Sequence, residues 1–191
     1  MSEMNASSEP LNLLSAEPSL KHSSVPRPIN ALAPLGPVSS PTELMKAVLA
    51  NDLSKANKCF HEAGRFTTNG ETALMMAAKR HQLSLVSLLL PQEKNMQDKD
   101  GYTALMYAAC YNHVEIARLL TCELGKQTSS GWTALMLAVF HNSLGCIPLL
   151  LSEAPLRNRM GYTAQDLAGK GGRVEALQAI TASPTFPRAP T

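Results

Sequence analysis

The chain has 191 residues, of which 17 are basic and 15 acidic, for a formal net charge of +2. A charge this balanced argues against nucleic acid as a partner, because binding to phosphates draws its affinity from clustered Lys and Arg. The longest apolar run, around Leu88–Leu90, stops at Pro91, well short of the roughly 18 residues that a membrane-spanning helix needs. We therefore expect a cytoplasmic protein without membrane insertion, and leave attachment to the cytoskeleton open.

Residues 1–39 contain six prolines and eight serines. This composition predicts a disordered N-terminal arm, because it buries too little apolar surface to offset the entropy of ordering. Two apolar islands, 11–14 and 29–32, are candidates for linear docking motifs, and Ser40, followed by Pro41, is a candidate phosphorylation site. Residues 183–191 carry three further prolines and predict a short disordered tail.

Between residues 40 and 182 the chain repeats itself. Gly-aromatic-Thr-Ala begins at Gly101, Gly131 and Gly161, and Gly-Glu-Thr-Ala begins at Gly70, so successive glycines are 31, 30 and 30 residues apart. A period in this range indicates stacked supersecondary units that bury their apolar faces against one another. Five units are predicted, starting near residues 40, 70, 101, 131 and 161, with a divergent first unit and a more polar last one.

Each unit predicts two helices joined by a turn. Counting the motif glycine as zero, Thr falls at plus two, where its hydroxyl can cap a first helix of good helix formers. In the third unit Leu105, Ala108 and Ala109 share one helical face, and after a polar break at Asn112 the segment 114–120 is amphipathic. The predicted fold class is an all-α helix-turn-helix solenoid.

The fourth unit contains Pro148 within its predicted second helix, with Gly145 just upstream. Proline removes a backbone donor and clashes with the preceding turn. This helix is therefore expected to be short or kinked.

The pattern Gly-x-Thr-Ala-Leu-Met-x-Ala-Ala, followed in the third unit by Asn112-His113 and by Ile-Ala-Arg-Leu-Leu at 116–120, resembles the ankyrin repeat over residues 40–182. Thr-Ala-Leu-Met replaces the family's Thr-Pro-Leu-His, and the period is shorter than the usual length of about 33 residues. The shortening is expected after the second helix, as in residues 91–100, and predicts abbreviated β-turn fingers. Both departures resemble the ankyrin-only proteins of diplomonad parasites such as Giardia.

This resemblance implies protein binding through the finger tips and the inner face of the first helices. Six of the nine aromatic residues fall at such positions, and aromatic and arginine side chains dominate interface energetics. An aromatic that recurs at plus one is equally consistent with packing against the neighbouring finger. Trp132 is the strongest single candidate, and Tyr111 and Phe140 lie off the recurring position. The candidate partner-binding residues are Phe66, Lys79, Arg80, Tyr102, Tyr111, Trp132, Phe140, Arg157, Arg159 and Tyr162.

No motif typical of an enzyme occurs. Gly169-Lys170-Gly171-Gly172 lacks the spacing and the preceding strand of a phosphate-binding loop, and no Ser/His/Asp grouping or HExxH is present. The four cysteines form no CxxC pair, and Cys110-x-x-His113 is the one spacing that resembles a metal site. We therefore predict a non-enzymatic chain with no catalytic residue, cofactor or metal site.

Two functions remain open. The first is a monomeric scaffold that binds a partner protein on its concave face. The alternative is a regulator or adaptor whose N-terminal arm docks a kinase or cytoskeletal protein, or gates the repeat face. Deleting residues 1–39 distinguishes them, because a scaffold keeps its partner, a gated protein binds it more tightly and an arm-driven adaptor loses it.

Overall fold

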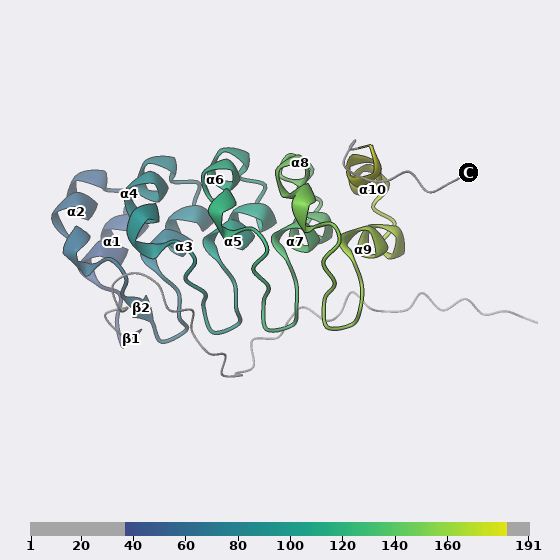
Figure 1. The fold of residues 1–191 in the computed structure, drawn as a ribbon. Helices are drawn as coiled ribbons and strands as arrows, with labels where there is room; N and C mark the ends of the chain where they lie inside the picture. The colour runs from purple at the N-terminus through teal and green to yellow at the C-terminus, as the bar shows by residue number, and fades with distance from the viewer. Residues whose placement is uncertain (1–36, 183–191) are drawn as a thin grey trace, which may run out of the picture.

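Five helix pairs stand side by side in one row in the computed structural model, which describes residues 37–182 (Figure 1). The first helices form one layer, the second helices form the other, and finger-like loops project from the row (Figure 1). This confirms the predicted helix-turn-helix solenoid. The first helices are α1 (Glu43–Leu49), α3 (Ala73–Lys79), α5 (Ala104–Cys110), α7 (Ala134–Phe140) and α9 (Ala164–Lys170), and the second helices are α2 (Leu53–Lys58), α4 (Leu83–Glu93), α6 (Val114–Leu119), α8 (Ile147–Leu150) and α10 (Val174–Thr181).

Every first helix begins after a threonine, as the sequence predicts. In each case the hydroxyl oxygen accepts a hydrogen bond from the backbone N–H three residues further on, at 3.2 to 3.3 Å. This satisfies one of the donors that a helix start leaves without an intrahelical partner. The capping residues are Thr42, Thr72, Thr103, Thr133 and Thr163.

The turn inside each helix pair passes through one residue with a positive φ angle. Four of the five such residues are asparagine or glycine, which adopt this left-handed conformation more readily than other residues. The second unit differs, because its turn residue is a histidine. The turn residues are Asn51, His81, Asn112, Asn142 and Gly172, with φ angles of 55°, 58°, 56°, 56° and 64°.

The core lies between the two helix layers and between neighbouring units. The Leu and Met that follow each threonine cap are fully buried in the first four units, as are the alanines near the end of α3 and α5. Small side chains at these places let neighbouring helices approach closely. In the fifth unit Gln165 is half-buried and Asp166 is exposed at the places of Leu and Met, which suits the outer face of a terminal unit.

Neighbouring fingers are joined by backbone hydrogen bonds. The N–H of Lys99 donates to the carbonyl of Asn69 at 3.0 Å, and the N–H of Ser129 donates to that of Asp100 at 2.8 Å. Side chains add a second tie, because Gln97 Nε2 donates to the carbonyls of Gly101 and Gln127, at 2.7 and 3.0 Å. The fingers therefore form a continuous edge along the row.

The fingers begin later than the sequence suggests in the second unit. Residues 91–100 are predicted as finger, but α4 continues through Pro91 to Glu93. The second helices themselves differ in length, from eleven residues in α4 to six in α6 and four in α8. The third and fourth units continue after the second helix with short 3₁₀ turns, η3 (Thr121–Glu123) and η4 (Leu151–Glu153), as the first unit does with η2 (Phe60–Glu62).

The first finger has an additional strand. Pro37–Val38 forms β1, which pairs in parallel with β2, Phe66–Thr67. Residues 37 and 38, which the sequence assigns to the arm, are therefore part of the folded structure, and Ser40 is exposed between β1 and α1. Residues 1–36, which include both apolar islands, and the tail at 183–191 lie outside the described residues.

The short helix α8 confirms the effect expected of Pro148, which stands in its first turn. The N–H groups of Cys146 and Leu149 donate to carbonyls three residues back, as in a 3₁₀ turn. We expect faster amide hydrogen exchange over residues 143–151 than over residues 114–120, because a weak helix inside a nearest-neighbour stack opens at lower free energy. Exchange followed by mass spectrometry measures this, and equal protection of the two segments would contradict it.

A buried glutamate ties each interior unit to the unit before it. One carboxylate oxygen of Glu123 accepts from the N–H of Leu105 at the start of α5, at 2.8 Å, and the other accepts from Asn95 of the preceding unit, at 2.9 Å. Glu93 and Glu153 do the same in their units. Burial raises the pKa of all three carboxyl groups above its usual value, and the backbone donors oppose that rise.

Candidate partner-binding surface

In the second, fourth and fifth units two side chains meet on the inner face, one at plus one in the finger and one at plus nine at the end of the first helix. We call them the inner-face pairs. Their chemistry changes from unit to unit. Lys79 Nζ lies 2.5 Å from Glu71 Oε1 in the second unit, the rings of Trp132 and Phe140 meet edge to face at 5.6 Å in the fourth, and Lys170 Nζ lies 3.7 Å above the Tyr162 ring in the fifth. Tyr102 and Cys110 hold these positions in the third unit.

Tyr107 belongs to the same surface, although the sequence does not single it out. Its ring stacks on Tyr102 at 5.3 Å, lies 3.9 Å from Lys79 Nζ, and its hydroxyl donates to Asp98 Oδ2. Burial is the main reason that the pKa of Tyr107 is raised and that the pKa of Tyr102 rises to about 12. Tyrosine at plus six, where the second, fourth and fifth units carry Met or Leu, is the signal that could have identified it.

The residues predicted to contact a partner differ in exposure. Tyr111 is 57% exposed, and Arg80, Arg157 and Arg159 are exposed as well. Arg157 has a structural contact, since its Nη1 donates to the carbonyl of Gly161 at 2.7 Å. Gln97 Nε2 donates to the carbonyl of Gly101 in the same way. The remaining half-buried candidates, all members of inner-face pairs, are Lys79, Tyr102, Trp132, Phe140 and Tyr162.

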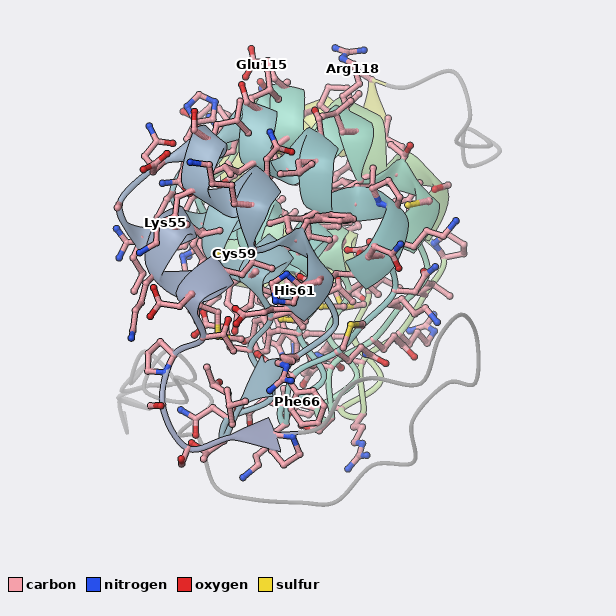
Figure 2. All side chains as sticks on the ribbon, turned by 90° about the vertical axis from the view of Figure 1, so that its left-hand side faces the viewer. Lys55, Cys59, His61, Phe66, Glu115 and Arg118 are labelled. Carbon is pink, nitrogen blue, oxygen red and sulfur yellow. The ribbon has the colours of Figure 1, made fainter. Side chains whose placement is uncertain are left out.

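Phe66 is placed differently from the other candidates. It lies in β2, is 8% exposed, and pairs with Pro37 of β1 in the strand register. Figure 2, which looks along the row from its N-terminal end, shows Phe66 in the finger layer, away from Glu115 and Arg118 at the opposite edge. Its burial leaves little of the Phe66 side chain for a partner to contact.

A cluster of rings lies at the turns of the second and third units. The His81 and His113 rings stack at 4.5 Å, and Tyr111 stacks on His113 at 5.9 Å. His113 Nε2 lies 3.2 Å from the carbonyl of Lys79, which links the two units. The exposed Tyr111 ring therefore lies beside the contact between His113 and the Lys79 carbonyl that links the two units.

His113 should make stability depend on pH. Burial, the first cause, and neighbouring His81 lower its pKa below 6.5, so its contribution is present above the unfolded pKa and is lost as pH falls below it. We expect His113→Gln to lose less stability than the wild type on acidification, because Gln82 Nε2 makes the equivalent bond, to Val48, at 2.8 Å. Urea unfolding near pH 7.5 and near pH 5.5 tests this.

Two other titratable side chains, His81 and Glu115, lie near the His113 ring. His81 stacks on it and lies 3.5 Å from Glu115, and both remain in the variant. Parallel losses of stability in the wild type and in His113→Gln would assign the acid sensitivity to those neighbours.

No group of three or more His, Cys, Asp or Glu side chains that could hold a metal ion occurs within residues 37–182. Over the same residues, none of the helices has the length and hydrophobicity required to cross a membrane.

Comparison with known families agrees with the geometry. The description "Ankyrin repeats (3 copies)" matches residues 44–129, and "Ankyrin repeat" matches residues 130–159. Together these matches cover more than half of the chain, and the structure adds α9 and α10 as one further unit of the same design. No curated protein matches the chain. With its period, its threonine-capped helix pairs and its row of fingers, the chain belongs to the ankyrin-repeat family.

Proposed function

We propose that this chain is a non-enzymatic protein-interaction module that holds a partner protein on the inner face of the row. Ankyrin repeats generally mediate contacts between proteins. The observation that carries the proposal is the contrast between two classes of position. Glycine, the threonine cap and the buried glutamate recur because the stack needs them, whereas the inner-face pairs change from Glu–Lys to Tyr–Cys, Trp–Phe and Tyr–Lys. Positions that the fold leaves free are the ones available for recognition.

The exposed Tyr111 offers the sharpest test. We expect Tyr111→Ala to lose a protein that the wild type retains in quantitative affinity purification, with little change in thermal unfolding, because truncation of an exposed aromatic removes contact area without opening a cavity. Leu119→Ala is the matched control, since Leu119 is 39% exposed on α6 of the same unit. Equal loss from both variants would reject a specific contact at Tyr111, and absence of any loss from both Tyr111→Ala and Trp132→Ala would reject the inner face as the binding surface.

Trp132→Ala is expected to reduce both partner binding and thermal stability. Its ring is half-buried against Phe140, and such aromatic pairs contribute about 0.5–1.5 kcal/mol beyond their buried area. The variant should therefore lose partner binding and also unfold at a lower temperature. Unaltered affinity together with a lower melting temperature would assign Trp132 to packing alone.

The alternative function, in which the arm docks a kinase or cytoskeletal protein or gates the repeat face, has one structural observation in its favour. The pairing of β1 with β2 anchors the end of the arm at the first finger. Deleting residues 1–36 leaves that pairing intact and is a cleaner test than deleting residues 1–39. Tighter partner binding would indicate gating, and loss of the partner would indicate docking by the arm.

A monomer located in the cytoplasm, with or without attachment to the cytoskeleton, is part of the same proposal. The polar outer positions of the fifth unit, Gln165 and Asp166, favour a stack that ends there without joining another copy. The short period and the Thr-Ala-Leu-Met sequence favour a place among ankyrin-only proteins of the diplomonad type.

A further inference from the structure

The charges of the inner face are arranged differently at its two ends. In the second unit Lys79 is neutralised by Glu71 at 2.5 Å. In the fifth unit the cations lie against aromatic rings without a directly paired carboxylate, with Lys170 Nζ 3.7 Å above Tyr162 and Arg173 Cζ 5.3 Å from the centre of Phe140 of the fourth unit. The positive charge at this end therefore remains available.

Carboxylates are scarce around these cations. Within residues 37–182, no carboxylate oxygen lies within 4.0 Å of a side-chain nitrogen of Arg159, Lys170 or Arg173. Asp166 lies 3.8 Å from Arg157, and its charge also interacts with that of Lys170 at longer range. Met160, which follows Arg159 in the finger before Tyr162, adds apolar surface because it is 58% exposed. We call Trp132, Phe140, Arg159, Met160, Tyr162, Lys170 and Arg173 the C-terminal basic–aromatic patch.

We propose that this patch binds an extended acidic segment of the partner protein, in which carboxylates alternate with apolar side chains. The inference rests on the proposed function and names the chemistry of the partner. A cation that rests on a ring is already oriented, so it gives up less conformational freedom when it meets a carboxylate. The patch thus presents fixed positive charges beside apolar surface.

The geometry of the row sets the spacing of the carboxylates. Neighbouring helices pack about 8–10 Å apart, and an extended chain advances about 3.3 Å per residue. A segment that crosses from α7 to α9 therefore advances roughly three residues per unit by these spacings. Carboxylates three residues apart would reach Arg173, which lies over Phe140 at the end of α7, and Lys170 at the end of α9 in turn.

The rings of the patch favour a peptide over a single-stranded nucleic acid. Bases bind such proteins by stacking on open aromatic faces. Here Lys170 covers a face of Tyr162, Arg173 lies over Phe140, and Trp132 meets Phe140 edge to face. Carboxylates need the cations and not the ring faces, so the acidic peptide is the better fit.

Fluorescence anisotropy with a labelled peptide of repeated Glu-Glu-Leu triplets tests the proposal. We expect the wild type to bind it, more weakly as salt is added, and to bind the matching Gln-Gln-Leu peptide far less. The triple variant Arg159→Gln, Lys170→Gln, Arg173→Gln should weaken binding on the order of tenfold, because it removes the exposed cations of Arg159 and Lys170 and the half-buried cation of Arg173. The double variant Arg159→Gln, Lys170→Gln should show an intermediate loss, and it tests the proposal should the triple variant fail to fold.

The matched control removes three exposed cations from the second-helix side of the row. Lys58→Gln, Lys94→Gln, Arg118→Gln should bind the Glu-Glu-Leu peptide as the wild type does, because these residues are exposed outside the patch and Arg118 lies at the edge opposite the fingers (Figure 2). Equal losses in the two triple variants would overturn the proposal, as would equal binding of the Gln peptide. If an oligothymidine bound more tightly than the Glu-Glu-Leu peptide, the patch would be assigned to single-stranded nucleic acid and the acidic segment would be rejected.

Failure of this proposal is separable from failure of the proposed function. If Tyr111→Ala still loses a captured protein while the Glu-Glu-Leu peptide does not bind, the acidic segment is rejected and the interaction module stands.

Discussion

Gly101→Ala is expected to lower the free energy of unfolding by about 2–5 kcal/mol, combining about 1–2 kcal/mol for a left-handed alanine with about 1–3 kcal/mol for displaced packed atoms. Gly101 has a φ angle of 83°, and an added Cβ would lie 2.8 Å from the backbone nitrogen of Ser129 and 2.9 Å from Thr128 Cα. Because these atoms belong to the next finger's backbone, relief requires two fingers to separate. Equilibrium denaturation in urea measures the loss.

Gly161→Ala is the control that the chain itself offers. Its φ angle of 82° imposes the same backbone strain, but an added Cβ would meet nothing within 4 Å, because no described finger follows the fifth unit. The expected loss is only the conformational part, about 1–2 kcal/mol. Equal losses in Gly101→Ala and Gly161→Ala would show that contact between fingers contributes nothing measurable.

Glu123→Gln is expected to destabilise the stack by about 2–4 kcal/mol, the usual cost of leaving a buried donor unpaired and losing a charge-assisted hydrogen bond. Glutamine has one acceptor oxygen, whereas two N–H groups, from Leu105 and Asn95, point at the carboxylate of Glu123. One donor must then face an NH₂ group. Urea unfolding gives the free energy, and amide exchange at Leu105 and Asn95 shows which bond is lost.

Glu62→Gln separates bridging from simple capping. The half-buried Glu62 accepts from the N–H of Leu44 at 2.8 Å, within its own unit. The amide oxygen of glutamine can replace that bond, so the expected loss stays within about 1 kcal/mol. A loss as large as that of Glu123→Gln would contradict the role of the interior glutamates as links between units.

The helical framework could be predicted because its signals are local. Glycine, threonine and the Leu-Met-x-Ala-Ala segment act within one unit, so one period sufficed to place caps, helices and turns. Pro148 likewise acts on its own helix, and α8 has the short length expected of it.

The features that were missed depend on contacts between units. Glu62, Glu93, Glu123 and Glu153 recur at intervals close to the period, but a charged residue near a helix end usually indicates solvent exposure. Only the stacked neighbours show that three of them are buried. The burial of Phe66 was also missed, because β1, which pairs with its strand, comes from a segment whose proline and serine content predicts disorder.

The candidate site could be predicted by position but not by contact. The positions at plus one and plus nine do meet on the inner face, whereas the ion pair, ring pair and cation–ring pair found there depend on side-chain geometry. Because the rings of the inner-face pairs are half-buried, Tyr111, at 57% exposure, is the most exposed aromatic of the predicted set.

The glutamate links also give the row a direction. Each one accepts a hydrogen bond from the unit that precedes it. In the fifth unit Thr163 caps α9, and the Asp166 carboxylate accepts from the Thr163 N–H within the same turn. Removing the fifth unit would take no hydrogen-bond donor from a buried carboxylate of the described residues. Removing the first unit would take away the Gly64 N–H that donates to Glu93. The loss of the first unit therefore breaks a hydrogen-bonded link of this kind, whereas the loss of the fifth unit breaks none within residues 37–182.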